Sequence, residues 1–433
     1  MATTELTRSP TPGEAGPPLG TRLMLPAAFT DGTRRAMVLI WVSSRAGMLL
    51  VLGLLGGPVT GDVLYYARSL HTMFSSGGTL RQTLQEYPVP VLGIMLPQYL
   101  VGALNSVAFA FLFVASMLAV DAAFTAFLWR VGGRRIGPAL TFWLLFAPAM
   151  GPIAYFRFDL IPAVLTGTAL LALVRRPRWT GVLTALGTAL KLWPVVMLPV
   201  FALRRGSRGP VLRAFVATGV VIGAATFAIA GYSRLVSPVN WQAQRGLQIE
   251  SVPATPLMLA RAVHPHGTWD IRTSKYKATE IFGFGVHPML LVSTAVTAAA
   301  LLALAWLWLR CRQFGDDSVT LGWLILAAAA VLTVTNKTLS PQYILWLGGP
   351  VAALFVLAPR DAAVRRVAGV LLGLSVITQV IYPIWYAKLV NVGWYTLPMT
   401  LLLAARNALL IALAGLAGLE VWRRTSDRTA VRS

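Results

Sequence analysis

Charged residues are scarce in this sequence: they make up 12% of its 433 residues, whereas an ordinary soluble domain carries about a quarter. Hydrophobic residues make up 56%, and a chain with this composition would aggregate in water. Its apolar residues form uninterrupted stretches of about 20, such as 109–129 and 211–231, which match the thickness of a bilayer core. The scarcity of charge therefore predicts an all-α integral membrane protein.

Cysteine is also nearly absent, since Cys311 is the only one, so neither an intramolecular disulfide nor a cysteine-based metal site is available. His264 and His266 flank a proline, but no third metal ligand follows at a recognisable spacing. The sequence has no glycine-rich phosphate loop, no HExxH, no GxSxG and no DxD motif. Nucleotide chemistry is unsupported, and we expect neither a metal nor a cofactor.

A net charge of +22 is compatible with nucleic-acid binding, but the basic residues form short clusters at the ends of apolar stretches. Such clusters mark the cytoplasmic side of a membrane protein, because Lys and Arg resist translocation. We therefore expect no nucleic-acid partner, and we place these clusters in the cytoplasm: 34–35, 130–135, 175–178, 204–213, 310–312, 360–366 and 423 onward.

Threading the chain between these clusters predicts a bundle of about 12 transmembrane helices. The expected domains are a disordered cytoplasmic tail (1–33), a polytopic membrane domain (34–424) and a second cytoplasmic tail (425–433), with long outer loops at 59–103 and 232–287. The expected spans are 37–57, 108–129, 136–148, 160–173, 211–230, 288–309, 319–334, 344–357, 367–384 and 397–421. Segment 179–203 is too short for two crossings, so we expect two half-helices that form a dipping hairpin around Lys191 and Pro194.

The first outer loop supplies a candidate catalytic base, Asp62. It lies a few residues past a span, where a carboxylate is costly to bury unless it has a partner or a role. The alternative is a helix N-cap with Gly61 as the turn. Further along, Arg81 to Pro97 mixes charges, prolines and aliphatic residues, as an interfacial segment lying on the bilayer does.

Two further outer segments carry candidate binding residues. Residues 240–252 bring together amides, a tryptophan, Arg245 and Glu250, a composition suited to sugar hydroxyls and a phosphate. The alternative is a solvated loop with an internal pair between Arg245 and Glu250. Lys337, Gln342 and Tyr343 lie between two spans and would face either a substrate or lipid headgroups.

Four motifs together resemble glycosyltransferase family 87, over about residues 34–424. They are Gly61-Asp62, the hairpin sequence Ala189-Leu190-Lys191-Leu192-Trp193-Pro194, the stretch from Arg245 to Ser251, and Ser340-Pro341-Gln342-Tyr343. The family comprises polyprenol-phosphate-sugar-dependent transferases of the GT-C fold, among them mannosyltransferases and arabinofuranosyltransferases.

The resemblance implies a GT-C bundle in the cell membrane that works on the extracytoplasmic face. Its donor would be a polyprenyl-phosphate sugar, taken here as mannose, and its acceptor a glycolipid or glycan. Asp62 would be the base, accepting the hydroxyl proton while the acceptor oxygen displaces phosphate with inversion. Cations such as Arg245 and Lys337 would stabilise the leaving phosphate, which removes the need for a metal. The donor-binding residues implied are Arg245, Gln248, Lys337, Gln342 and Tyr343.

The main alternative is a non-catalytic transporter or flippase of polyprenyl-linked sugars. Such a protein is expected to have internally repeated halves and charged residues inside its bundle. The sequence shows no repeat and, apart from Lys191, we expect the spans to be nearly free of charge. A structural partner of a cell-wall complex is a third reading, in which Asp62 would be dispensable.

Overall fold

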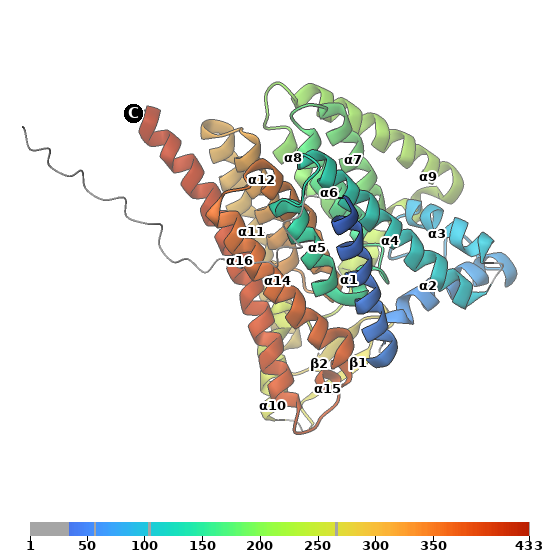
Figure 1. Cartoon of the computed structure of the whole chain (residues 1–433). Coiled ribbons are helices and arrows are strands. Elements are labelled where there is room, and N and C mark those ends of the chain that lie inside the picture. The colour runs from blue at the N-terminus through green and yellow to red at the C-terminus, as the bar shows by residue number, and fades with distance from the viewer. Residues whose placement is uncertain (1–33, 56–57, 103–104, 265–266, 433) are drawn as a thin grey trace, which may run out of the picture.

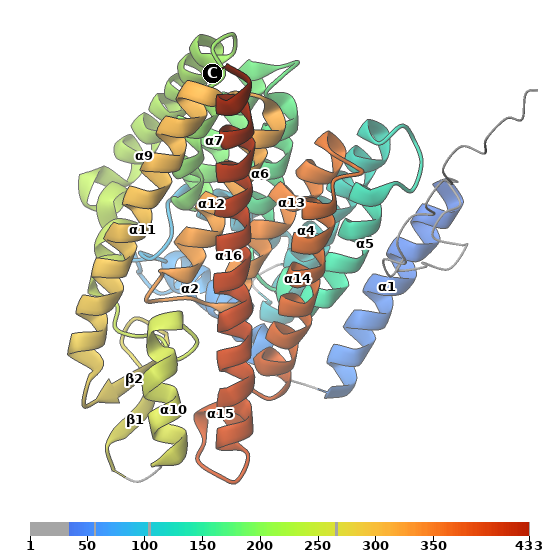
Figure 2. The ribbon, with the colours of Figure 1, turned by 90° about the vertical axis from the view of Figure 1, so that its left-hand side faces the viewer.

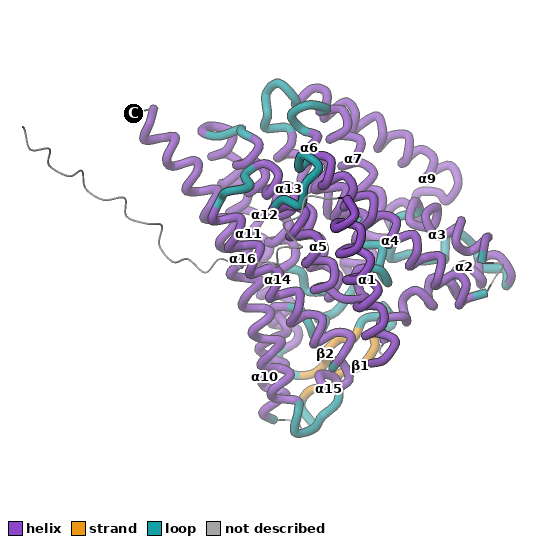
Figure 3. Tube along the Cα trace, in the orientation of Figure 1, coloured by secondary structure: helices purple, strands orange, loops and turns teal. Residues whose placement is uncertain are grey.

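The computed structural model describes residues 34–55, 58–102, 105–264 and 267–432, and helices dominate within them (Figure 3). The strands described are a short antiparallel hairpin, β1 (Trp269–Thr273) paired with β2 (Thr279–Gly283). The predicted tail at 1–33 lies outside the described residues.

The first half of the chain forms eight α-helices within the described residues. They are α1 (Arg34–Leu55), α2 (Gly61–Ser75), α3 (Pro90–Val101), α4 (Ser106–Val131), α5 (Pro138–Met150), α6 (Leu160–Ala172), α7 (Pro177–Leu190) and α8 (Leu198–Phe201). Three 3₁₀ turns, Pro58–Thr60, Gly151–Ala154 and Trp193–Met197, precede α2, follow α5 and precede α8.

The second half contains the longer helices. They are α9 (Arg208–Gln244), α10 (Thr255–Val263), α11 (Val286–Phe314), α12 (Ser318–Val334), α13 (Leu345–Leu357), α14 (Ala362–Gln379), α15 (Tyr386–Val390) and α16 (Thr396–Arg432). Short turns of 3₁₀ helix at Val252–Ala254 and Pro341–Ile344 lead into α10 and α13, and a π turn at Val380–Ile384 extends α14.

Local sequence explains several helix starts. The side chains of Asn105, Asp317 and Asp361 accept hydrogen bonds from backbone N–H groups in the first turns of α4, α12 and α14. These N–H groups have no partner inside their own helix, so the caps define where each helix begins. Proline opens α5 and α7, where its missing N–H is harmless.

Among the described residues, five helices are long and apolar enough to cross a membrane: α4, α9, α11, α14 with its π turn, and α16. Ten expected spans coincide with helices, but the expected total of about 12 transmembrane helices, which counts the two halves of the hairpin, stays a prediction. Helices α12 and α13 are shorter and buried almost all round, so they form the centre of the bundle.

The dipping hairpin has unequal arms. Helix α7 has 14 residues and ends at Leu190, with Lys191 as its C-cap, and the chain then returns through one 3₁₀ turn and the four-residue α8. Helix α7 packs closely against α9: a Cβ at Gly181 would lie 2.2 Å from the carbonyl oxygen of Val211. Two half-helices were expected, and the structure replaces the second with a compact turn.

The expected outer loops are largely helical. The first contains α2 and α3, so α3 takes up part of the expected interfacial segment. Near the expected start of the second, Gly231 has a φ of 79° and kinks α9, and helix continues beyond the kink to Gln244. The expected tail at 425–433 continues α16 as far as Arg432.

Basic connections gather at one end of the bundle. Arg204 bonds to Ser318, Arg310 to Thr425 and Ser426, and Arg424 to Asp361. We call this the basic end; it carries the C-terminus of α16, whereas β1, β2, α10 and α15 lie at the opposite end, the strand end (Figures 1 and 2).

Candidate active site

Asp62 lies in the first turn of α2 and forms an ion pair with Arg157, with 2.7 Å between Oδ2 and Nε. The Asp62 side chain is 42% exposed and that of Arg157 only 5%, so part of the carboxylate remains open to a reacting group. The N-cap of α2 is Thr60, with no side-chain cap bond. The helix-cap alternative for Asp62 is therefore wrong.

Arg157 is held in place by its remaining N–H groups. Nη1 donates to the backbone carbonyls of Val59 and Phe156 at 3.0 and 2.9 Å, and Nη2 donates to the Tyr382 hydroxyl at 3.1 Å. A guanidinium fixed on this many sides orients the carboxylate beside it. Arg157 was not among the expected site residues, although it lies on the connection between the expected spans 136–148 and 160–173, and a cation there was the available signal.

Asp159, on the same connection, forms a second ion pair, with Lys191. Lys191 Nζ donates to both carboxylate oxygens at 2.8 and 3.0 Å, and Trp346 Nε1 donates to Oδ1 at 2.8 Å. Asp159 is buried, and Lys191 stands where the hairpin breaks at the end of α7. An ammonium has three donors, and within the described residues the hydrogen bonds to Asp159 use two of them.

Aromatic rings surround the Lys191 ammonium. Its Nζ lies 5.0 Å from the ring centre of Tyr343, 5.2 Å from Phe158, 5.7 Å from Trp346 and 5.9 Å from Tyr87. Ring faces attract a cation at these distances and hold it in a partly desolvated site.

A cavity of about 310 Å³ lies beside Lys191, and we call it the hairpin cavity. Its polar lining includes Glu86, Gln242 and Asn336, and its apolar lining includes Leu192, Val195, Val196 and Leu332. It thus combines one cation, Lys191, and one carboxylate, Glu86, with an apolar wall.

Arg245, Gln248 and Lys337 come together as a second cluster. Arg245 Nη2 donates to Gln248 Oε1 at 3.1 Å, the Gln248 backbone N–H donates to the Lys337 carbonyl at 3.0 Å, and Lys337 Nζ donates to the Ala243 carbonyl at 3.1 Å. Gln248 is buried and also bonds to Ser340, so its amide is committed within the protein. Burial lowers the pKa of Lys337, with Glu280 opposing the shift.

Gln342 and Tyr343 differ in placement. Tyr343 is buried, stacks on Trp346 with 4.1 Å between ring centres, and lines the hairpin cavity. Gln342 is half-buried, and the described residues show no hydrogen bond to its side chain. Tyr343 therefore belongs to the Lys191 site, whereas nothing in the geometry singles out Gln342.

No curated protein and no solved structure matches this chain. A family model does match. Residues 86–278 fit glycosyltransferase family 87. This is the family that the motifs resemble, so the resemblance is confirmed, and the match supports a membrane glycosyltransferase. The matched segment contains Arg157, Lys191 and Arg245, whereas Asp62 and Lys337 lie outside it.

Two other carboxylates in this chain have different surroundings. Glu250 pairs with Arg406 of α16 at 3.5 Å, and both side chains are almost fully buried, so the alternative of a solvated loop with an Arg245–Glu250 pair is wrong. Burial raises the pKa of Glu250 to about 7, with Arg406 opposing the shift. Glu86 accepts a hydrogen bond from Tyr65 at 2.8 Å and faces the hairpin cavity.

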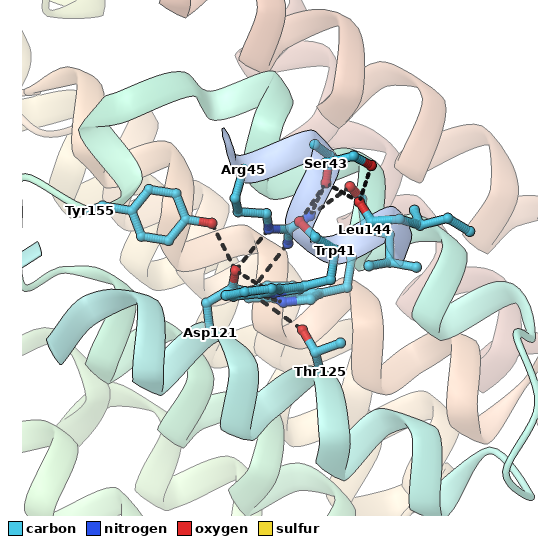
Figure 4. Close-up of polar contacts among 10 residues, drawn as sticks. Trp41, Ser43, Arg45, Asp121, Thr125, Leu144 and Tyr155 are labelled. Atoms are coloured by element: carbon cyan, nitrogen blue, oxygen red, sulfur yellow. Dashed lines mark hydrogen bonds and ion pairs between the residues drawn. The ribbon is translucent and has the colours of Figure 1, made fainter. Parts of the chain in front are cut away.

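The expectation that the spans are nearly free of charge, apart from Lys191, is wrong. Arg45 in α1 pairs with Asp121 in α4, and Arg406 lies in α16. The Asp121 carboxylate accepts five hydrogen bonds of 3.3 Å or less (Figure 4): one each from Trp41, Trp143 and Tyr155, and two from Arg45. Two carboxylate oxygens offer about four lone-pair sites, so Asp121 is saturated and its role is structural.

The histidine pair is only partly visible, because His266 lies outside the described residues. Where the chain is described, no group of three His, Cys, Asp or Glu side chains is arranged to hold a metal ion.

Proposed function

We propose that this protein transfers a sugar from a polyprenyl-phosphate donor to a glycolipid or glycan acceptor on the extracytoplasmic face of the cell membrane. Asp62 is the base, and the strand end faces outward. Mannose as the sugar rests on the family resemblance alone.

One observation carries the proposal: Arg157 and Asp159, on a single buried connection, hold Asp62 and Lys191 respectively. The rings of Tyr87 and Phe158 meet edge to face with 4.9 Å between ring centres, and their centres lie 5.9 and 5.2 Å from Lys191 Nζ. Burial, with Tyr66 and Asp62, raises the pKa of Tyr87, which also lies within reach of Lys191. A partly exposed carboxylate and an ammonium are therefore held by two residues that lie two positions apart in the chain.

This arrangement suits an inverting displacement. The acceptor oxygen forms its bond to the anomeric carbon from the face opposite the phosphate, and its proton passes to the Asp62 carboxylate. The bond between the anomeric carbon and the phosphate oxygen breaks, and the electron pair leaves with the polyprenyl phosphate. Lys191 joins Arg245 and Lys337 as a cation able to stabilise that phosphate.

The apolar wall of the hairpin cavity supports a lipid donor. Leu192, Val195 and Val196 come from the return arm of the hairpin, and Leu332 comes from α12. Leu192 and Val195 are aliphatic, yet each leaves 40% of its surface exposed. An isoprenoid tail beside the phosphate would cover such residues, since burial of apolar surface is favourable.

The test is to incubate purified protein in nanodiscs with polyprenyl-phosphomannose and membrane glycolipids, and to detect mannosylated product by mass spectrometry. Asp62→Asn keeps the size of the side chain but removes the proton acceptor, so turnover should fall by roughly 10²- to 10⁴-fold while donor binding survives. Asp270→Asn is the matched control, because Asp270 is an exposed carboxylate of β1 at the same end.

Near-normal turnover by folded Asp62→Asn protein at saturating donor would reject Asp62 as the base. Glu86 and Glu250 would then be the next carboxylates to substitute.

The flippase alternative gains one observation, the charged residues within the spans. The saturation of Asp121 weakens it, because a carboxylate with five protein donors has no site left for a transported group. Movement of the labelled donor between vesicle leaflets, without any glycosylated product, would favour the flippase.

A further inference from the structure

A cavity of about 840 Å³ opens at the basic end, away from Asp62. It lies between α8, the start of α9 and the end of α11, and we call it the basic crevice. Its volume is in the range of about 300–1,000 Å³ that is typical of pockets for small-molecule ligands.

Three arginines line the basic crevice: Arg205 before α9, Arg208 at the start of α9 and Arg312 in the last turn of α11. All three are exposed, and none forms a salt bridge in the part of the chain that the structure describes. Asp316 is the single carboxylate of the lining. The crevice therefore carries a surplus of two positive charges and suits an anion.

The walls below the arginines are apolar. Leu203, Leu212 and Trp308 line the crevice, and Trp308 donates from its ring nitrogen to the Pro199 carbonyl at 3.0 Å, which joins α11 to α8. Tryptophan is enriched where a membrane meets water. A purely water-soluble anion would leave these walls uncovered.

The apolar surface continues from the crevice along both flanking helices. Helix α9 packs against α7, and α11 packs against α12 and α16. Their outer faces expose Val216 and Val220 of α9 and Leu302 and Leu309 of α11. A ligand with an anionic head and two apolar chains would place its head among the arginines and its chains along these faces.

We propose that the basic crevice binds one acidic phospholipid of the leaflet at the basic end. Its phosphate is held by Arg205 and Arg208, whose guanidinium groups match phosphate geometry. Basic pockets between transmembrane helices are suited to anionic headgroups. The lipid bridges α8, the return arm of the hairpin, to α11, and this site is independent of the transfer reaction.

The test uses the full-length protein, delipidated in neutral detergent and exchanged into nanodiscs of phosphatidylcholine with a minor fraction of phosphatidylglycerol. Native mass spectrometry after release from the nanodisc counts the retained lipids. The wild type should retain one phosphatidylglycerol in preference to phosphatidylcholine. Each arginine contributes about fivefold to the affinity, so Arg205→Gln with Arg208→Gln should retain phosphatidylglycerol about 25-fold less strongly.

Arg365→Gln with Arg366→Gln is the matched control, because both arginines are exposed on α14 at the same end but do not line the crevice. This control should retain the lipid as the wild type does. Leu212→Trp fills the crevice without changing its charge, and it should also lose the lipid while eluting as a folded monodisperse protein.

Three results would overturn the proposal. The first is equal retention of phosphatidylglycerol by the Arg205/Arg208 variant and the wild type. The second is equal retention of phosphatidylcholine and phosphatidylglycerol by the wild type. The third is a retained mass that matches a polyprenyl phosphate carried through purification in place of a phospholipid.

Discussion

Replacing Asp121 by leucine should destabilise the bundle strongly, because it leaves the Arg45 guanidinium buried without its counter-ion. Breaking a buried pair from one side costs about 3–5 kcal/mol. The ring nitrogens of Trp41 and Trp143 and the Tyr155 hydroxyl also lose their acceptor, at about 1–3 kcal/mol for each donor that finds no new partner. We therefore expect the free energy of unfolding to fall by at least about 3 kcal/mol, which is toward the upper end of single-substitution effects.

The same reasoning predicts that a second substitution partly repairs the first. In Arg45→Leu with Asp121→Leu no charge is left buried, so the double variant should be more stable than Asp121→Leu alone. The interaction free energy between substitutions at contacting residues is about 0.5–3 kcal/mol, and we expect roughly 2 kcal/mol for this pair. Arg45→Leu alone should be milder than Asp121→Leu, since three neutral donors still hold the carboxylate.

Equilibrium unfolding in mixed micelles of rising SDS content measures these free energies. Tryptophan fluorescence is a suitable signal because Trp41 and Trp143 bond to Asp121 directly. Asp270→Leu, at an exposed carboxylate, is the control and should change stability by less than about 0.5 kcal/mol. A loss below about 1 kcal/mol for Asp121→Leu, or strictly additive single and double variants, would refute the structural role of the cluster.

Four further predictions follow from the site and its setting. Arg157→Lys keeps the charge but loses the fork that orients Asp62, so turnover should fall about 10- to 100-fold with the donor KM unchanged, as initial rates would show. Because burial raises the pKa of Glu250 from 4.5 to about 7, the folded state holds a proton that the unfolded chain has released between these values. Stability to SDS should therefore fall as the pH rises from about 5 to 7, and Glu250→Gln should flatten this dependence. Transfer should persist in EDTA, because the leaving group is a phosphate that protein cations can stabilise; loss of activity restored by magnesium or manganese would contradict this. In a cysteine-free background, Ser75→Cys should react with an impermeant maleimide in intact cells and Gly206→Cys should not; both positions are exposed, so labelling of position 206 from outside would invert the topology.

The positions of the helices could be predicted from the sequence because one property, apolar run length, decides them. The kink at Gly231 and the break at Lys191 were also visible locally, as the end of an apolar run and as a segment of the wrong length. The helices inside the expected first outer loop could not be predicted, because α2 and α3 are stabilised by packing against the bundle.

The partners of the charged residues could not be predicted, because they lie far apart in the chain. Arg406 reaches Glu250 across 156 residues, and Arg45 reaches Asp121 across 76. A single charge barely changes the mean hydropathy of a span, so Asp121 did not register. Asp62 was ambiguous for a local reason. Gly61 beside it allowed Asp62 to be the N-cap of α2, but the 3₁₀ turn at Pro58–Thr60 makes Thr60 the N-cap.

The pairing of Arg45 with Asp121 has a consequence for biosynthesis. Helix α1 precedes α4 in the chain, and if α1 crosses the membrane as the sequence predicts, the arginine at its centre costs about 2.5–3.5 kcal/mol to insert. Its counter-ion in α4 is 76 residues away, so it leaves the ribosome only after α2 and α3. At a synthesis rate of about 5–20 residues per second, α1 waits roughly 4–15 seconds for its partner. During that interval α1 is a poorly stabilised span that depends on the insertion machinery, and substitutions at Asp121 would reduce the yield of the protein in the membrane before they could affect its chemistry.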